Sequence, residues 1–225
     1  MEKWGKRILF LLFSVGFLML IYPTVSNMWN NATQSKVIFD YEKKQSSISA
    51  DDYSAIFKKA KEYNNRLRQL KVPLTEYEKI EGYDTLLNIN GNGVMGYITI
   101  SKINIKLPIY HGTSEGVLAV GCGHLQGSSL PIGGKGNHSV ITAHCGLKRA
   151  ELFTHLYKLE KGDVFSVHIL DRNLEYRVDQ ILVVEPDDVE EIAINKEKDF
   201  CTLTTCTPYG INTHRLLVRG VRTDK

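Results

Sequence analysis

The stretch FCTLTTCTPYGINTHRLLVRGV, residues 200–221, contains two strand-like runs on either side of a turn. The first run is rich in β-branched threonine, and Pro208 and Gly210 then turn the chain sharply before the second run begins. Cys206 closes the first run. A cysteine in this place is either a small buried side chain or a nucleophile held at the end of a strand, and other parts of the sequence must distinguish the two.

Short β-branched or alternating runs continue over the whole chain from residue 96 onward. Gly, Pro, Asn and Asp separate the runs, which is typical of an all-β sandwich or barrel and not of alternating βαβ units. Short helices are expected near residues 115–120 and 149–154, and the Gly- and Ser-rich residues 121–136 are expected to form a long surface loop. The other runs are GYITI (96–100), IKLPIY (105–110), SVITAH (139–144), VFSVHIL (164–170) and LEYRVDQILVV (174–184).

The N-terminus carries an apolar run from residue 8 to residue 22, which extends to Val25 if Pro23 is tolerated. A helix needs roughly 17–20 apolar residues to cross a bilayer. The basic flank of Lys3, Lys6 and Arg7 predicts a signal-anchor with its N-terminus inside and the body of the chain outside the membrane. A cleaved signal peptide is the alternative, although no small-residue cleavage site follows the run. The chain ends RTDK without a second apolar span, so we expect a lone N-terminal anchor.

A polar stretch follows the anchor up to Ser49 and is expected to be a stalk, partly helical or disordered. Ser49 and Asp52 make a capping-box-like start, and apolar residues then recur at three- and four-residue steps from Tyr53 to Leu70. They predict an amphipathic helix that packs one face on the main domain and ends before Pro73, with a loop over residues 73–95. The predicted organisation is a cytoplasmic tail and transmembrane anchor at 1–25, a stalk, helix and loop at 26–95, and a β domain at 96–225.

The charge balance and the cysteines narrow the classes of function. The chain has 28 Lys and Arg against 25 Asp and Glu, a net charge of +3, and no arginine-rich arm, so nucleic acid is not an expected partner. An even number of cysteines in an exported chain would suggest disulfides. Cys201 and Cys206 on one extended strand would be about 16 Å apart, whereas a disulfide needs Cα atoms within about 7 Å. A local disulfide is therefore disfavoured, and one of these thiols can stay free.

Three side chains at predicted strand ends form a minimal set for acyl transfer: Cys206 after FCTLTT, His144 at the end of SVITAH, and Arg215 at the start of HRLLVRGV. A free thiol has a pKa of about 8.5, so a nucleophilic cysteine needs cationic neighbours. If the three strands are adjacent, the thiolate attacks a carbonyl, the imidazolium protonates the leaving amine, and the guanidinium orients the substrate or holds the oxyanion. Each residue alone also has an ordinary role, as a buried thiol, a surface histidine or a snorkelling arginine.

Other chemistries have weaker signals in this sequence. Zinc would need thiolate and imidazole ligands, but those present match no usual zinc-finger spacing. Ser139 and Thr142 are not part of a G-x-S-x-G turn. The acidic stretch 187–191 is expected to be a solvated loop rather than a calcium site. The side chains that could offer zinc ligands are Cys122, His124, His138, His144, Cys145 and Cys206. We expect no metal and no cofactor.

The stretch TLTTCTPYGINTHRLLVRG, residues 202–220, resembles the TLxTC signature and the following arginine strand of sortases. The blocks MGYITISKINIKLPIYHGTSEGVL, GHLQGSSLPIGG, NHSVITAHCGL and VVEPDDV are similar to those of class C, the pilin-polymerising branch. The resemblance extends from about Tyr63 to the C-terminus. It implies an eight-stranded sortase β-barrel with short helices. It also implies a cysteine transpeptidase that cleaves a sorting signal of LPxTG type through a thioacyl-enzyme.

Carried over residue by residue, the resemblance implies that the catalytic residues are Cys206 as nucleophile, His144 as acid and base, and Arg215 as the essential arginine. We expect Thr204 and Thr205 to line the substrate groove, with residues 121–136 and the turn at 186–188 on its flanks. The implied partners are the membrane, the sorting signal of a pilin or surface protein, and an amine acceptor. A pilin lysine as acceptor gives pilus polymerisation. A peptidoglycan amine would instead give wall anchoring, and a third alternative is a non-catalytic β-barrel scaffold whose Cys206 has ordinary reactivity.

Two departures from the class C pattern concern the site. Class C enzymes usually carry a lid with an Asp-Pro-aromatic motif, and the matching stretch VPLTEYEKIEGYDTLLN, residues 72–88, lacks it. Autoinhibition by this lid-like loop is therefore in question, and Tyr77 is either a vestigial plug or a packing residue. The residue after the histidine is usually Arg in this class, and here it is Cys145. On a strand Cys145 would point away from the face of His144, so we expect a spectator thiol, the alternative being a thiol that tunes the site or oxidises near it.

Overall fold

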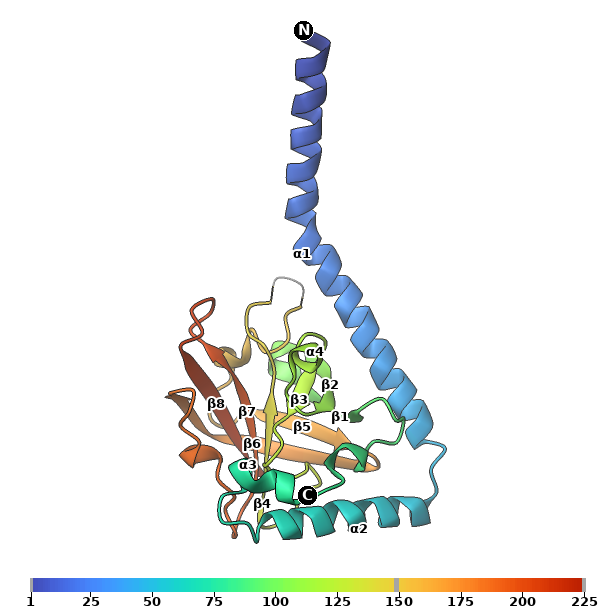
Figure 1. The fold of residues 1–225 in the computed structure, drawn as a ribbon, viewed down its shortest axis with the longest axis vertical. Coiled ribbons are helices and arrows are strands. Elements are labelled where there is room, and N and C mark those ends of the chain that lie inside the picture. The colour runs from blue at the N-terminus through green and yellow to red at the C-terminus, as the bar shows by residue number, and fades with distance from the viewer. Residues whose placement is uncertain (1, 148–149, 224–225) are drawn as a thin grey trace.

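The computed structural model describes residues 2–147 and 150–223, and its main body is a closed β-barrel (Figure 1). Within these residues the strands close in the order β1-β2-β3-β4-β7-β8-β6-β5. β3 pairs parallel with β2, β4 pairs parallel with β7, and the other neighbours are antiparallel. The strands are β1 (Val94–Ile100), β2 (Ile105–His111), β3 (Cys122–His124), β4 (Asn137–Thr142), β5 (Val164–Ile169), β6 (Arg172–Val184), β7 (Asp199–Thr207) and β8 (His214–Arg222).

Every strand except β3 corresponds to a predicted run, so the expectation of a mainly β, eight-stranded barrel is confirmed. The prediction of a surface loop at 121–136 is wrong, because this segment contains β3 and most of its residues are buried. Its polar groups have partners inside the protein, which allows burial without loss of hydrogen bonds. The His124 ring bonds to the Tyr83 hydroxyl and to the Ser129 carbonyl, both at 2.9 Å. The Asn64 side chain accepts from the Leu130 N–H at 2.8 Å and donates to its carbonyl at 3.0 Å.

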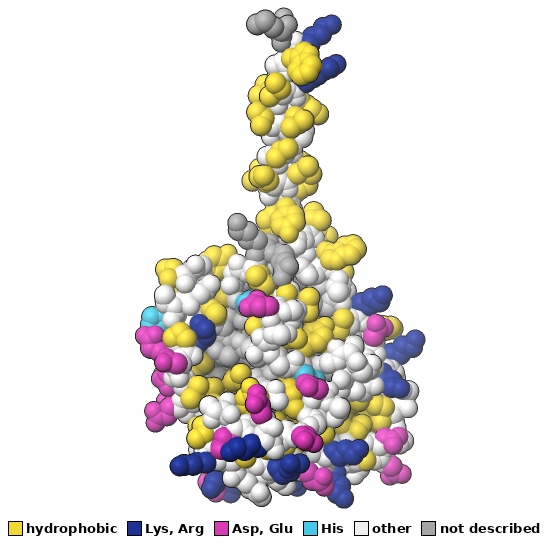
Figure 2. Space-filling view, in the orientation of Figure 1, with side chains coloured by type: hydrophobic (Ala, Val, Ile, Leu, Met, Phe, Trp, Pro, Cys, Tyr) yellow, Lys and Arg dark blue, Asp and Glu magenta, His cyan; other side chains and the backbone are white. Residues whose placement is uncertain are grey.

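Helix α1 (Glu2–Gln45) is continuous and contains both the predicted anchor and the predicted stalk. Its N-terminal part projects from the barrel with apolar side chains on all visible sides (Figure 2) and is long and apolar enough to cross a membrane. Its C-terminal part packs on the barrel. Tyr41 is fully buried there, and its hydroxyl donates to the Met95 carbonyl at 3.0 Å and accepts the Leu170 N–H at 2.9 Å. The stalk is therefore an ordered helix attached to the barrel.

The predicted amphipathic helix is α2 (Ala50–Leu67), and Ser49 caps it as expected by accepting the Asp52 N–H at 3.2 Å. One face of α2 is buried against the barrel, including Phe57, Tyr63 and Leu67. This face supplies apolar side chains to the same core cluster as the inward-facing residues of the strands.

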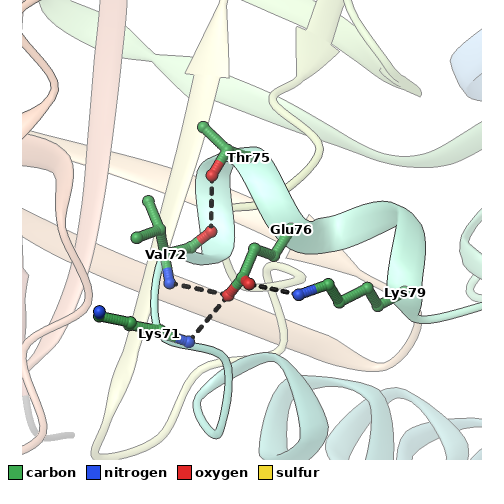
Figure 3. Close-up of polar contacts among 5 residues, drawn as sticks. All are labelled: Lys71, Val72, Thr75, Glu76 and Lys79. Atoms are coloured by element: carbon green, nitrogen blue, oxygen red, sulfur yellow. Dashed lines mark hydrogen bonds and ion pairs between the residues drawn. The ribbon is translucent and has the colours of Figure 1, made fainter.

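Residues 73–93 form short helical turns where we predicted a loop, and the barrel begins at Val94. The Glu76 carboxylate accepts the N–H groups of Lys71 and Val72, both at 3.0 Å, and pairs with Lys79 (Figure 3). These bonds satisfy donors at the start of the first turn, in the manner of a capping box. The turns are α3 (Pro73–Glu76), η1 (Tyr77–Lys79) and η2 (Tyr83–Thr85).

The first of the two predicted short helices is present as α4 (Glu115–Leu118). The second differs from expectation, because residues 152–155 form turns and the helical turn η4 (Leu156–Lys158) follows them. Lys148 and Arg149 lie outside the described residues. The remaining turns are η3 (Ser101–Ile103) and η5 (Glu190–Ile192).

Candidate active site

Cys206 is the second-to-last residue of β7, and it lies on the outer face of the barrel wall. Side chains alternate along a strand, and Cys201, Leu203 and Thr205 are buried on the inner side. Cys206 is only partly buried, and it is not in a disulfide. The odd spacing therefore separates Cys201 from Cys206, as the sequence predicts, and leaves the second thiol accessible.

Arg215 lies directly opposite Cys206 in the antiparallel register of β7 and β8. Residues in such a pair share a face of the sheet, with Cβ atoms about 5 Å apart. The guanidinium bends toward the start of its own strand, where Nη1 donates to the His214 carbonyl at 3.1 Å and to the Asn212 carbonyl at 3.5 Å. Arg215 thus lies beside Cys206 with its charged group at the rim of the barrel.

His144 follows β4 by two residues, in a segment that runs alongside the end of β7. Thr142 is opposite Thr204 in the parallel register, and the Ala143 N–H donates to the Thr204 carbonyl at 3.2 Å. Continuing the parallel register by two residues from Thr142 and Thr204 brings His144 level with Cys206. On its other side the His144 carbonyl accepts the Phe153 N–H at 3.1 Å. The three residues expected to carry the chemistry therefore come from adjacent segments of the chain at one end of the barrel.

His144 has one further neighbour that no sequence motif indicates. The Glu115 carboxylate of α4 lies 3.7 Å from His144 Nε2. The Glu115 side chain is 94% exposed, so water screens this pair and its energetic contribution is small. Its geometric effect is to offer an acceptor for the imidazole on the side of α4. Glu115 is distant from His144 in the chain and has no motif of its own, which explains why sequence reasoning missed it.

The two threonines expected to line a substrate groove have different environments. Thr204 is partly exposed on the same face of β7 as Cys206. Thr205 is 3% exposed, and its hydroxyl donates to the Ala143 carbonyl at 2.7 Å. This burial argues against the groove-lining role expected of Thr205. The bond instead fastens the residue before His144 to the residue before Cys206.

A second apolar cluster covers the outer face of the wall that carries Cys206 and Arg215. Its floor comes from β4, β6 and β8. Leu125 from the 121–136 segment, Ile192 from η5 and Leu74 from α3 lie over this floor. Tyr77 packs instead against the main core, which fits the packing alternative for this residue. The members of this outer-face cluster are Val140, Ile192, Leu217, Leu74, Leu125, Leu182 and Val184.

Cys145 is in a bend beyond the end of β4, so the strand alternation assumed for it does not apply. It is partly exposed and unpaired in the structure. Burial raises the pKa of the Cys145 thiol, and the neighbouring Cys206 raises it further. The bend removes the reason for placing Cys145 on the opposite face from His144, so the choice between a spectator thiol and a thiol that tunes the site stays a prediction.

The buried histidines considered as zinc ligands are occupied by other partners. His138 Nδ1 donates to the Ala193 carbonyl at 2.9 Å, so Nε2 accepts the Thr202 hydroxyl at 2.7 Å and the ring is neutral. Burial lowers the pKa of His138 and of His124 to about 4. Both rings therefore serve as internal hydrogen-bonding groups.

A cavity of about 1100 Å³ separates α1 from the segment after His144. Tyr22 and Pro23 of α1 line one side, and Leu147 and Tyr209 line the other. The Asn27 side chain accepts the Glu151 N–H at 3.2 Å, which bridges the two sides. Figure 1 shows the β7–β8 connection at the end of the barrel nearer the N-terminus of α1. The end of the barrel that holds Cys206 therefore faces the apolar part of α1.

Comparison with known proteins matches this arrangement to one family. Residues 98–223 fit the family model described as a sortase domain. A crystal structure of sortase C1 from Streptococcus agalactiae is 48% identical, with a TM-score of 0.78 over 84% of this chain and 99% of that one. The structure of Clostridium perfringens sortase C with the C-terminal cell wall sorting motif is 45% identical, with a TM-score of 0.72 over 85% and 100% of the two chains.

Among curated proteins, sortase D of Bacillus subtilis (strain 168) is 32% identical over 130 residues, which are 56% of this chain and 63% of that protein. The chain thus spans less than two thirds of the length of the curated relatives that it matches.

Proposed function

Because the chain belongs to the sortase family, and within it to class C, we propose that it is a cysteine transpeptidase that acts on LPxTG-like sorting signals. Cys206 is the nucleophile, His144 is the acid and base, and Arg215 orients the substrate. The main support is the cross-strand pairing of Cys206 with Arg215, together with the hydrogen bonds that bring the segment of His144 alongside β7.

The reaction has two acyl-transfer steps. The Cys206 sulfur attacks the carbonyl between Thr and Gly of the sorting signal, and His144 protonates the departing Gly amine as the C–N bond breaks. The acyl part remains on Cys206 as a thioester. An incoming amine then loses a proton to His144 and attacks the thioester, which releases the Cys206 thiol.

Arg215 has donors left for a substrate. Its two hydrogen bonds to backbone carbonyls both use Nη1. The guanidinium has five N–H donors, so Nε and Nη2 remain for a carbonyl of the sorting signal or for the oxyanion of the tetrahedral intermediate. A lysine ammonium is a compact point charge. It would offer neither the planar arrangement of guanidinium donors nor separate donors for the backbone and for the substrate.

The protein is held in the membrane by α1, with its N-terminus inside and the barrel outside. The basic residues Lys3, Lys6 and Arg7 before the apolar run support this orientation. The contact between Asn27 and Glu151 supports a position of the active-site end close to the membrane surface. This arrangement corresponds to a tail and anchor at 1–25, helical segments at 26–93 and a catalytic barrel from Val94 onward.

The amine acceptor is the lysine of a pilin, in keeping with class C, which gives covalent pilus polymers. The test is incubation of the full chain with a labelled sorting-signal peptide and, separately, a lysine-bearing pilin or a peptidoglycan cross-bridge amine. Ladders with the pilin are expected. Single products with the cross-bridge amine alone would favour wall anchoring, and cleavage of the peptide by Cys206→Ala at the parent rate would refute the nucleophile.

A further inference from the structure

Cys145 lies three residues beyond Thr142, in the segment that continues β4 alongside the end of β7 that carries Cys206. We infer that the two thiols form a reversible disulfide when a peroxide reaches the site, with Cys206 oxidised first and Cys145 resolving it. This modification is separate from transpeptidation. It rests on the proposed function only in taking Cys206 to be the reactive thiol.

The geometry follows from contacts on both sides of Cys145. Thr142 is level with Thr204, and the bond from the Thr205 hydroxyl to the Ala143 carbonyl continues this alignment. Beyond Cys145, a Cβ on Gly146 would lie only 2.9 Å from the ring of Tyr209, so this backbone also remains against the chain that follows Cys206.

The alignment places Cys145 within about one residue of Cys206. Neighbouring strands are about 4.8 Å apart and a residue advances about 3.3 Å, which gives a Cα separation of about 6 Å. Disulfides join Cα atoms about 4.4–6.8 Å apart, so the pair is within range. The bend at Cys145 frees its side chain from strand alternation, and the positive φ of 77° at Gly146 permits the turn that follows.

The environments of the two thiols suit different roles. Burial and the neighbouring Cys206 raise the pKa of Cys145, which keeps Cys145 a protonated thiol while Cys206 reacts. The other cysteines, Cys122 and Cys201, are fully buried, and burial raises the pKa of both. They are therefore protected from peroxide, and the chemistry is confined to the two partly exposed cysteines.

The steps balance with hydrogen peroxide as the oxidant. The Cys206 thiolate attacks one peroxide oxygen, the S–O bond forms, the O–O bond breaks, and the other oxygen leaves as water after taking a proton. Cys145 then gives up its proton and attacks the sulfenic sulfur, the S–S bond forms, and the S–O oxygen leaves as water. The two thiols lose two electrons to the peroxide, and a dithiol reverses the change by exchange.

The test is peptide mapping of the full chain in detergent after treatment with hydrogen peroxide and alkylation. Non-reducing tryptic digestion should give a cross-linked species of peptides 136–148 and 199–215, and fragment ions separate Cys206 from Cys201 on the second peptide. Alkylation of Cys145 and Cys206 should be lost together and return with dithiothreitol. In Cys145→Ser we expect Cys206 to pass to the sulfinic acid, which dithiothreitol does not restore.

Cys122→Ser is the matched control, and it should form the same cross-link as the parent. The inference is overturned if the parent shows no cross-link, if Cys206 is over-oxidised equally in the parent and in Cys145→Ser, or if the link joins Cys145 to Cys201. Because the readout is a covalent map, it does not depend on transpeptidation. Failure of the proposed function would appear separately, as peptide cleavage by Cys206→Ala.

Discussion

The buried hydrogen bond between the Thr205 hydroxyl and the Ala143 carbonyl should control catalysis without contacting substrate. It is 2.7 Å long, Thr205 and Ala143 are each 3% exposed, and it joins the residue before Cys206 to the residue before His144. Thr205→Val keeps the shape of the side chain but removes the donor. Loss of the bond and burial of an unpaired carbonyl should together lower the free energy of unfolding by about 1–3 kcal/mol.

The same change should loosen the backbone that carries His144. Misplacement of a catalytic group by about 1 Å can lower a rate by about a hundredfold, so we expect kcat for sorting-signal cleavage to fall by about tenfold or more in Thr205→Val. KM should change little, because Thr205 does not face the substrate. The assay is steady-state cleavage of a labelled peptide, with urea unfolding measured on the same samples.

Thr205→Ser is the matched control for this prediction. It keeps the hydroxyl and loses one buried methyl group, which costs about 1 kcal/mol of stability. Its kcat should stay within about twofold of the parent, because the bond that positions His144 is kept. A parent-like kcat in Thr205→Val, or an equal loss in both variants, would show that the Thr205 hydrogen bond does not position His144.

Three further predictions concern pH, the guanidinium and the covering segment. The pKa of buried His124 and His138 is about 4 in the folded protein and about 6.5 unfolded, so the unfolded state binds more protons below pH 6.5. The free energy of unfolding should have its full value above pH 6.5 and fall toward pH 4, by up to roughly 3 kcal/mol for each residue. A free energy of unfolding in urea that does not change over this range would contradict the burial of neutral rings. Arg215→Lys should lower kcat by about tenfold with an unchanged unfolding midpoint, because the fork that orients the carbonyl is lost, and parent-like kinetics would exclude that role. Leu74→Ser should raise the rate of peptide cleavage below saturation, because Leu74 covers the outer-face cluster, and an unchanged rate would show that α3 does not restrict access.

The barrel was predictable because most of its strands are long enough to show alternation and end at clear turn signals. β3 was not, because its three residues are embedded in a Gly- and Ser-rich segment. That segment is buried through hydrogen bonds from distant residues such as Asn64 and Tyr83, which no local pattern reports. The same limit applies to the helical stalk, whose order depends on the burial of Tyr41 against the barrel.

The candidate site was predictable at the level of residue identity but not in its supporting contacts. The inward position of Thr205 follows from the outward position of Cys206, because side chains alternate along a strand. The position of Cys145 depends on where β4 ends, and strand ends are poorly defined by sequence. The approach of Glu115 to His144 depends on the packing of α4, which has no signal near either residue.

The proposed mechanism requires that one thiol, Cys206, forms the acyl-enzyme. The decisive experiment is mass spectrometry of the full chain trapped during reaction with a sorting-signal peptide and then digested without reduction. We expect a thioester between the threonine carboxyl of the peptide and Cys206, and no such adduct in Cys206→Ala. An adduct on Cys145, or peptide cleavage with no covalent adduct on any cysteine, would contradict it.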